Sequence, residues 1–464
     1  MQERSMQVLW FKRDLRLSDH LPLFEAMRNA KHHGLVLPLY IHEPSQIADA
    51  HTARQHQLFV HECLDDLKQQ FAHVGGYLHE ELGEAVDVLA RLHAQFKFTH
   101  VWAHQETTQL AQYRRDQAVA AWCKSMGVAL HEFPQNNVQR ATFMANPFAE
   151  KINFQTYLDR AAQEEIKNPA GRNLQAFFAP QPAVELNRAT VPQAVGDDKP
   201  LRMKGGRAQA RAVAAKFFTP AKLRSYPFSI SSPLKAWSGC SRLSPYLAYG
   251  VVSDREVLQK LNALVNRVHG QGDATHIAKV EDAARFYVDR LIWRQGYLQQ
   301  LENHTGLETD AFYCDEPAEV NQEFLNAWQQ GRTGFAYVDA CQRFLQQTGW
   351  LNMRARAMLV SFACVQLGLP WQPVALFLAQ QFLDFEPAIH YGQVRIASGT
   401  SHFSQMLVYD PLKQQAEQDP KGEFVKRWLP EHGTANYPAP IVDNAESLKL
   451  GKARLHAMRQ SRLD

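Results

Sequence analysis

The chain has 464 residues, enough for two or three domains that bury their cores without disulfides or metals. Hydrophobic residues make up 45% and charged residues 21%, which is typical of globular proteins and excludes disordered or fibrous classes. The net charge of +3 conceals a local excess: residues 201–300 contain 16 Lys and Arg but 6 Asp and Glu. That excess favours a polyanionic partner, with a merely solvated basic face as the alternative.

The cysteines and the apolar runs exclude further classes. The closest two of the six cysteines, Cys341 and Cys364, lie 23 positions apart, so no zinc or iron–sulfur spacing occurs. We therefore expect a reduced, cytoplasmic protein without a metal site. The N-terminus lacks the apolar stretch of a signal peptide, and no run approaches the roughly 18 apolar residues of a membrane span.

Strands and helices alternate through residues 1–135. Short apolar runs predict strands, and segments with helical periodicity predict helices between them. In chain order these are the strand 7–11, the helix 22–30, the strand 35–41, the helix 56–73, the strand 99–104, the helix 114–127 and the strand 128–133. This rhythm predicts an α/β domain with a Rossmann-like parallel sheet covered by helices.

The pattern changes after residue 135. Residues 179–200 contain four prolines, so we read 136–200 as an interdomain linker. From 201 onward the chain is mainly helical, with helical spacing in 283–303 and 353–368. We therefore expect an all-α domain over 201–464.

The segment 238–250, SGCSRLSPYLAYG, indicates an anion site. Ser244 followed by Pro245 predicts a helix N-cap with proline at the first helical position. The free backbone N–H groups at such a helix start attract anions, and Ser241 and Arg242 add a hydroxyl and a guanidinium. A pyrophosphate would fit there; an ordinary capped helix is the alternative.

Two arginines and two carboxylates form a second set. On a helix Arg354 and Arg356 point to roughly opposite sides, so one can face a buried ligand while the other faces solvent or phosphate. Asp384 and Glu386 lie in a phenylalanine-rich stretch, where a buried carboxylate needs a partner. Arg356 is the candidate partner of Asp384, either beside a ligand or in a purely structural ion pair.

A third set lies within 286–297, FYVDRLIWRQGY. Arg290 and Arg294 are four residues apart, and so are Trp293 and Tyr297. A face that mixes arginines with aromatic rings suits phosphates and stacked bases. The alternative is that the aromatic rings face the core while the arginines face water.

Together these stretches resemble the photolyase/cryptochrome family of blue-light flavoproteins. The segment 8–20, VLWFKRDLRLSDH, is similar to its opening strand and loop, and 238–250 resembles its FAD-diphosphate motif. RLIWRQ, TGWLNMRARAMLVSF and GEFVKRWLPE also match. The resemblance spans about residues 6–431 and implies an α/β antenna domain followed by an all-α domain that holds U-shaped FAD.

The resemblance also implies roles for individual residues. The places that bind FAD are taken by Tyr226, Cys240, Ser241, Arg242, Leu243, Ser244, Arg294, Arg356, Asp384, Glu386 and His390. Trp293 matches the tryptophan that packs against a flipped pyrimidine dimer, and Arg354 matches a DNA-facing arginine. Arg290 and Met353 stand at further positions expected to face DNA.

Four positions depart from the pattern of repair enzymes. Arg290 stands where a glutamate usually bonds the dimer, and Met353 stands where an asparagine lies near both flavin and lesion. Ile396 replaces a second lesion-stacking tryptophan. His390 replaces an asparagine that faces flavin N5, so it either tunes flavin protonation or is a hydrogen-bonded buried histidine. The pocket therefore differs from the one that usually binds a cyclobutane dimer in this family.

The electron-transfer tryptophans change as well. Trp371 matches the middle one, whereas Val394 occupies the flavin-proximal place and the distal place near Ala318 holds no tryptophan. Aliphatic residues do not relay holes, so we expect photoreduction by the usual route to fail. Tyr391 is either a substitute relay or a packing residue.

The leading hypothesis is an FAD-dependent DNA photolyase with Trp293, Arg290, His390 and Trp371 as catalytic residues. Its expected partner is UV-damaged DNA, bound by a monomer. A second, antenna chromophore would bind near 104–109, after a sheet strand, unless that site is empty. The alternatives are a cryptochrome-like blue-light photoreceptor without repair activity, and a flavoprotein that acts on RNA or another substrate.

Overall fold

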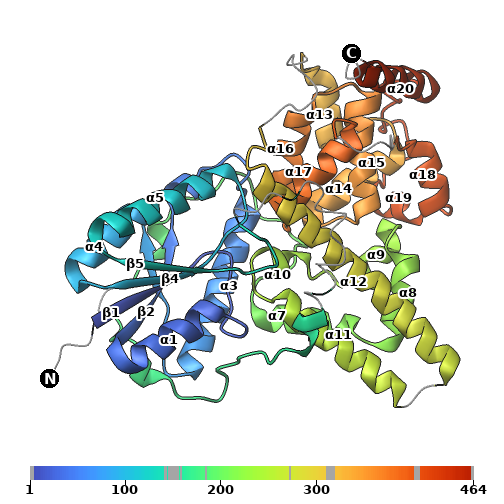
Figure 1. Ribbon diagram of the computed structural model, residues 1–464. Helices are drawn as coiled ribbons and strands as arrows, with labels where there is room; N and C mark the ends of the chain where they lie inside the picture. Colours follow the sequence, from blue (N-terminus) through green and yellow to red (C-terminus); the bar gives the residue numbers. More distant parts are fainter. Residues whose placement is uncertain are drawn as a thin grey trace. The chain divides into compact units, whose positions relative to one another are not determined.

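The computed structural model describes residues 5–140, 144, 156, 159–182, 185–270, 273–309, 319–401 and 408–460. The chain forms two compact units. The first comprises Met1–Asp197, Lys204–Pro220 and Leu243–Thr305; the second comprises Asp198–Met203, Ala221–Arg242 and Gly306–Asp464. Figure 1 labels the helices and strands of both units.

A parallel sheet lies in the first unit, as the sequence predicts, and it has five strands where the sequence patterns identify four. Its strand order is β3 (His79–Leu82), β2 (Gly34–His42), β1 (Ser5–Phe11), β4 (His100–His104) and β5 (Ala129–Phe133). The intervening helices are α1 (Leu21–His33), α2 (Pro44–Ile47), α3 (Arg54–His73), α4 (Ala85–Phe96) and α5 (Leu110–Met126). The order reverses between β1 and β4, so the carboxyl ends of these strands form the switch point at which ligands bind in such sheets.

The sequence patterns do not predict β3 and α4. The strand reads HEEL, without a β-branched or aromatic residue, and yet it pairs with β2 from Leu39–His79 onward. Its position therefore depends on hydrogen bonding to β2 and not on its own propensity. The apolar spacing of Val88, Leu89 and Leu92 would have identified α4.

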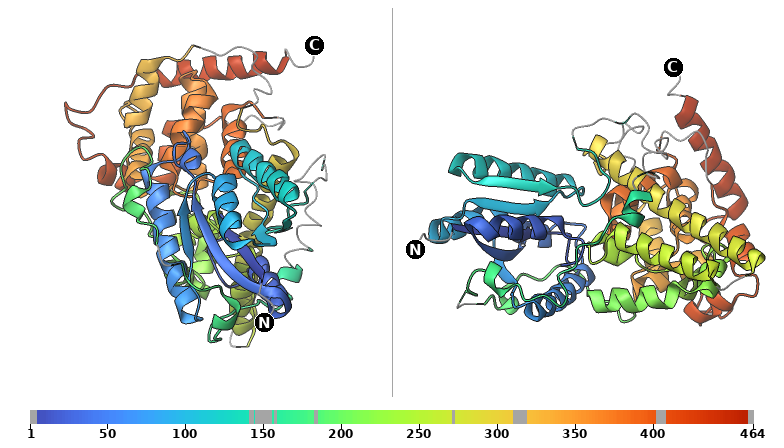
Figure 2. Two further views of the ribbon diagram at one scale, coloured as in Figure 1. Left: turned by 90° about the vertical axis from the view of Figure 1, so that its left-hand side faces the viewer. Right: turned by 60° about the horizontal axis from the view of Figure 1, so that its bottom comes forward.

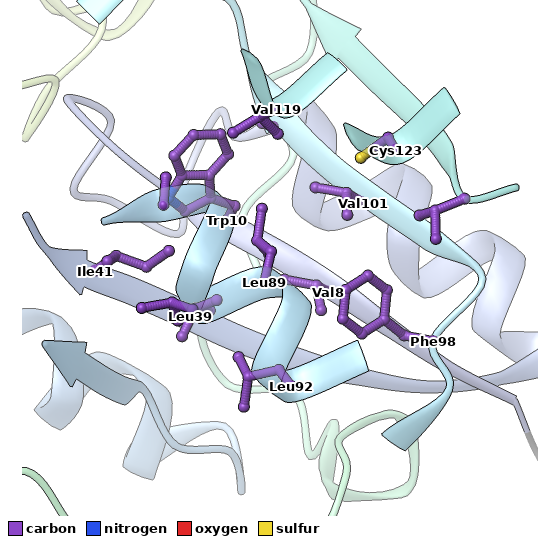
Figure 3. Close-up of a cluster of buried hydrophobic side chains, with 14 of the residues drawn as sticks. Val8, Trp10, Leu39, Ile41, Leu89, Leu92, Phe98, Val101, Val119 and Cys123 are labelled. Atoms are coloured by element: carbon purple, nitrogen blue, oxygen red, sulfur yellow. The ribbon is translucent and has the colours of Figure 1, made fainter. Parts of the chain in front are cut away.

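Apolar side chains of β1, β2, β4, α4 and α5 fill one face of the sheet (Figure 3). Val8, Trp10 and Leu89 are at most 2% exposed, and burying each such side chain contributes roughly 1.5–3 kcal/mol. Successive strand residues point to opposite faces, so Phe11 faces the other layer, where its ring contacts Phe71 of α3 edge-on. The sheet is thus a rigid two-sided support for the loops at its carboxyl edge.

The proline-rich segment is fixed to the first unit. Arg188 Nη2 lies 2.7 Å from Glu80 Oε1 on β3, and Phe178 forms a parallel bridge with Val36 of β2. Ion pairs and bridges therefore fix the described part of the segment that its prolines led us to interpret as an interdomain linker. The two units also differ from the predicted boundaries at 135 and 200, and the domain assignment stays a prediction.

The remainder of the first unit is helical. It contains η1 (Gln175–Phe177), η2 (Arg188–Thr190), α7 (Arg207–Phe217), α10 (Ser244–Ala248), α11 (Asp254–His269) and α12 (Ala274–Asn303). Ser253 and Glu256 form a capping box that starts α11. Asp273 caps α12, a helix of 30 residues that is conspicuous in Figure 1.

Helices make up the second unit, which Figure 2 shows from two further directions. They are α8 (Pro220–Ser229), α9 (Pro233–Gly239), α13 (Gln322–Gln330), α14 (Ala336–Thr348), α15 (Met353–Ser361), η3 (Phe362–Gln366), α16 (Trp371–Gln381), α17 (Pro387–Ser398), α18 (Pro411–Gln418), α19 (Glu423–Trp428) and α20 (Asn444–Gln460). Gly349 and Gly399 end α14 and α17 with positive φ, which glycine adopts without strain. Within the described ranges no helix has the length and apolar character of a membrane span.

Candidate functional site

A buried triad organises the loop after β1. The carboxylate of Asp14 accepts hydrogen bonds from His20 Nε2 at 2.9 Å and from His104 Nδ1 at 2.8 Å through the same oxygen. Its second oxygen accepts the backbone N–H of Lys12 at 2.7 Å. Burial alone would raise the pKa of Asp14, but the charges and hydrogen bonds of both histidines hold it well below its ordinary value. The carboxylate is thus ionised and fully bonded.

The triad is close enough to suggest a metal site, since three potential ligand atoms lie within 4.8 Å of one another. The tautomer of His20 argues for hydrogen bonding. Its Nδ1 accepts the backbone N–H of Leu23 at 3.2 Å and caps α1, so the proton resides on Nε2, the atom that faces Asp14. A protonated nitrogen has no lone pair for a metal, and we interpret the triad as structural.

The triad makes stability depend on pH. Burial lowers the pKa of His104 to about 3 and also lowers that of His20, although Asp14 opposes both shifts. Below pH 6.5 the unfolded chain therefore binds more protons than the folded chain, and acid favours unfolding. We expect the free energy of unfolding to fall from pH 6.5 downward, by up to about 1.4 kcal/mol per pH unit and histidine. Urea unfolding between pH 7 and pH 4 measures this slope.

His104→Asn is the matched variant for this prediction. Its amide N–H replaces the donor at Nδ1 but does not titrate. The slope of the variant should be shallower than that of the wild type, and an unchanged slope would show that His104 does not contribute to it.

The loop after β1, which contains Asp14, forms hydrogen bonds to the end of α10 and the residues that follow it. Arg13 Nε donates to the Ala248 carbonyl at 2.9 Å, and Arg16 Nη1 donates to the Gly250 carbonyl at 2.8 Å. Between them the Leu15 N–H donates to Tyr249. Gly250 has φ of 60°, and a Cβ there would lie 2.3 Å from the Arg13 carbonyl oxygen. The motif 8–20 and residues 243–250 of the second motif are therefore physically coupled within the first unit.

The start of α10 differs by one residue from the prediction. The helix begins at Ser244, and Leu243 occupies the N-cap position with helical φ and ψ and no side-chain cap bond. The first backbone bond of the helix runs from the Leu247 N–H to the Leu243 carbonyl, which places Leu243 and not Ser244 at the N-cap position. Arg242, immediately before, has φ of 52° and lies over the Trp237 ring at 4.5 Å.

The residues predicted to bind FAD are distributed over both units. Leu243, Ser244 and Arg294 belong to the first unit, and the others belong to the second. In the second unit, Tyr226 is buried on α8, and burial raises the pKa of Cys240 to about 12, so its thiol stays protonated.

One pocket in the second unit brings together most of the remaining predicted residues. Its lining residues border about 430 Å³ of empty space, a figure that includes open solvent, and they include Met353, Arg356, Asp384, Glu386, His390 and Val394. Leu378, Phe382 and Phe385 supply apolar walls. Met353 is 38% exposed, whereas Asp384 and His390 are each 9% exposed. Ile396 is not among the lining residues.

An ion pair forms the polar edge of this pocket. Arg356 Nη2 lies 2.8 Å from Asp384 Oδ2 and 2.9 Å from Oδ1, while its Nε donates to the Leu351 carbonyl at 2.7 Å. The guanidinium also lies 4.0 Å from the centre of the Phe382 ring, a wall that the sequence reasoning missed. Arg354 points elsewhere: it is exposed, 3.8 Å from Glu417. The two arginines thus diverge as helical geometry requires.

His390 is hydrogen-bonded and lines the same pocket. Its Nε2 lies 2.9 Å from the Ala375 carbonyl oxygen and so carries the proton. Tyr391 is next to it, with ring centres 5.2 Å apart, and Tyr391 lies 6.1 Å from Trp371. Trp371 itself is 4% exposed. The position near Ala318 lies outside the described residues.

Arg294 on α12 also has a carboxylate partner. Its Nη1 lies 3.2 Å from Asp254 Oδ2, and Gln295 donates to the same oxygen. Asp254 is the first residue of α11, and only the fold reveals that it pairs with α12. Trp293 is partly buried and Arg290 is exposed.

A network of ions occupies the carboxyl edge of the sheet, where the antenna site was expected. Arg115 contacts Glu43 at 2.8 Å, Glu106 at 2.6 Å and Asp116 at 2.8 Å, and Lys12 contacts Asp116 at 2.8 Å. Burial alone would lower the pKa of Arg115, but the three carboxylates raise it well above its ordinary value. Residues 104–109 thus contribute His104 to the triad and Glu106 to this network.

Comparisons with known proteins agree with these motifs. The family described as "DNA photolyase" matches residues 7–169, and "FAD binding domain of DNA photolyase" matches residues 287–436. A deoxyribodipyrimidine photo-lyase of Vibrio cholerae is 24% identical over 95% of this chain and 97% of that protein. A cryptochrome DASH of Gloeobacter violaceus is 27% identical over 91% of this chain and 85% of its own length. The crystal structure of a Synechocystis cryptochrome, at 20% identity, superimposes on 98% of this chain and 100% of its own with a TM-score of 0.84, which shows a common fold.

Proposed function

Because this chain belongs to the photolyase/cryptochrome family, we propose that it is an FAD-dependent DNA photolyase that splits pyrimidine dimers with light. When bound and reduced, the flavin would supply the light-driven electron donation, and the protein would hold cofactor and lesion. The observation that carries the proposal is the apolar pocket edged by Arg356 and Asp384. Apolar walls suit a flat ring system, and a guanidinium beside a carboxylate suits its polar edge.

Each residue has a proposed task. Arg356, Asp384, Glu386 and His390 contact the ring system in the pocket. The diphosphate and the rest of the cofactor are held by Tyr226, Cys240, Ser241, Arg242, Leu243, Ser244 and Arg294. Trp293 packs against the flipped dimer, with Met353 at the pocket mouth. Val394 keeps the flavin-proximal relay place aliphatic, so we expect chemical reduction to be needed in vitro.

Arg354 tests the DNA-binding part of the proposal. Arg354→Ala should weaken binding to duplex DNA and lower the slope of log K against log salt by about one, because a phosphate contact releases about one counterion. FAD content should be unchanged, because Arg354 lies outside the residues that line the pocket. Fluorescence anisotropy across a salt series measures the slope. Identical slopes for variant and wild type would remove Arg354 from the DNA-binding surface.

The second candidate function is a cryptochrome-like photoreceptor without repair. The substitutions at Arg290, Met353 and Ile396 favour it, because they alter the positions expected to hold the dimer. Light-dependent loss of dimers from DNA would support the photolyase, and its absence would support the photoreceptor.

The protein acts as a cytoplasmic monomer on UV-damaged DNA, without a metal. A second chromophore binds at the carboxyl edge of the sheet, beside the Arg115 network, because ligands of parallel sheets bind at the switch point. Absorbance of purified protein beyond that of FAD tests this point.

A further inference from the structure

One face of α12 carries a row of three aromatic side chains and one cationic side chain. Phe286, Arg290, Trp293 and Tyr297 are spaced four, three and four residues apart, which aligns them along the helix. Exposure is highest at Arg290, which is exposed, whereas Phe286 and Trp293 are partly buried and Tyr297 is 3% exposed. The surface-exposed part of the row is thus Arg290, and its C-terminal end at Tyr297 lies in the core of the first unit.

Arg290 is directed along the helix toward Phe286. Its guanidinium carbon lies 4.8 Å from the centre of the Phe286 ring. Long helical side chains lean toward the N-terminus of their helix, which carries Arg290 toward Phe286 and away from Trp293. Arg290 therefore does not reach toward Trp293 as a direct substitute for the glutamate expected at its position.

Arg290 forms no ion pair with any of the residues that the structure describes. Its neighbours on α12 differ: Arg285 lies 2.5 Å from Asp282, and Arg294 lies 3.2 Å from Asp254. An exposed guanidinium that lies on an aromatic ring and lacks a carboxylate leaves its outer face for a ligand. A planar cation of this kind binds flat π systems and phosphates.

We propose that Phe286 and Arg290 form a stacking platform for a nucleobase that flanks the damaged site, up to about three base steps away. The proposal rests on the proposed function, because Trp293 marks where the lesion would lie. Seven residues separate Phe286 from Trp293, about 10 Å along the helix at 1.5 Å per residue. That distance corresponds to about three base steps of 3.4 Å. The platform extends recognition from the lesion to neighbouring nucleotides and accounts for an arginine at position 290.

Two conservative variants test the platform. Arg290→Lys keeps the charge but removes the flat surface, and Phe286→Leu keeps apolar volume but removes the ring. Arg285→Lys is the matched control, since Arg285 is an exposed arginine of the same helix that is paired with Asp282. The readout is anisotropy of a labelled duplex that carries one thymine dimer, with FAD-loaded protein in the dark. Stoichiometric FAD and an unchanged thermal midpoint show that each variant is folded.

We expect both variants to bind the damaged duplex about tenfold more weakly than the wild type, with an unchanged salt slope. The control should remain within twofold. The double variant should be no weaker than either single variant, because ring and guanidinium act as one surface. If the Arg290→Lys protein binds DNA with wild-type affinity, the platform is overturned, because the charge of residue 290 is then sufficient without a flat guanidinium. If the losses of affinity in the two single variants multiply in the double variant, the ring and the guanidinium act independently, and that result would also overturn the platform.

The same experiment distinguishes the platform from the proposed function. A wild type that binds the damaged duplex and loses affinity in both variants supports the platform even if no repair occurs under light. Unaffected variants alongside a weakened Trp293→Ala protein would overturn the platform while the DNA-binding proposal stands. A wild type without affinity for DNA would overturn both.

Discussion

The Arg356→Leu protein is expected to lose FAD and to be less stable than the wild type. Asp384 is buried, with 4% of its side chain exposed, and Arg356 is its cation in the pocket. Removing one partner of a buried pair leaves an uncompensated charge, at a cost of about 3–5 kcal/mol. The ratio of flavin to protein absorbance measures FAD, and urea unfolding measures stability.

Two further variants separate cofactor binding from folding. Arg354→Leu changes an exposed arginine two residues away on α15 and should leave both readouts near wild type. Adding Asp384→Leu to Arg356→Leu removes the orphaned charge, so it should recover much of the stability but none of the FAD. Stoichiometric FAD in Arg356→Leu would contradict the assignment of this pocket to the flavin.

Asp14→Asn should also be strongly destabilising, although it is nearly isosteric. One carboxylate oxygen becomes an NH₂ group that faces either the Lys12 N–H or the N–H groups of His20 and His104. Leaving buried donors without an acceptor costs about 1–3 kcal/mol each, so we expect a loss of about 3 kcal/mol. Urea unfolding at pH 7.5, where the histidines are neutral, measures it.

Asp49→Asn is the matched control for that prediction. Asp49 bonds His51 at 2.7 Å, but both side chains are about one-fifth exposed, and solvent can replace the lost interaction. Its loss should stay below about 1 kcal/mol. If the two substitutions lower the free energy of unfolding equally, burial does not increase the contribution of the Asp14 hydrogen bonds to stability.

Local pattern is sufficient for part of this account. The parallel sheet follows from alternating strand and helix periods, and the divergence of Arg354 and Arg356 follows from helical geometry. The pairing of Arg356 with Asp384 follows from the need of a buried carboxylate for a cation. In each case residue types and short spacings determine the result.

Other features depend on contacts between distant segments. Asp14 meets His104 because β1 lies beside β4, an adjacency that periodicity alone does not reveal. Arg115 pairs with Glu43 after β2 and with Glu106 after β4, because both strands lie beside β1 in the sheet. The proline-rich segment is fixed by Arg188, whose partner Glu80 lies on a strand without strand-like composition. Phe286 and Arg294 both lie four residues from Arg290, so spacing makes either of them its possible neighbour. The direction in which the Arg290 side chain leans selects Phe286.

The most direct test of the central claim is light-driven repair by chemically reduced protein. Reduction bypasses the relay position occupied by Val394. FAD-loaded, reduced protein is mixed with a duplex that carries one thymine dimer, and loss of the dimer is followed under blue light and in the dark. We expect the dimer to be lost in the light and to remain intact in the dark. An intact dimer after illumination, with FAD bound and reduced, would contradict this expectation and favour the photoreceptor reading.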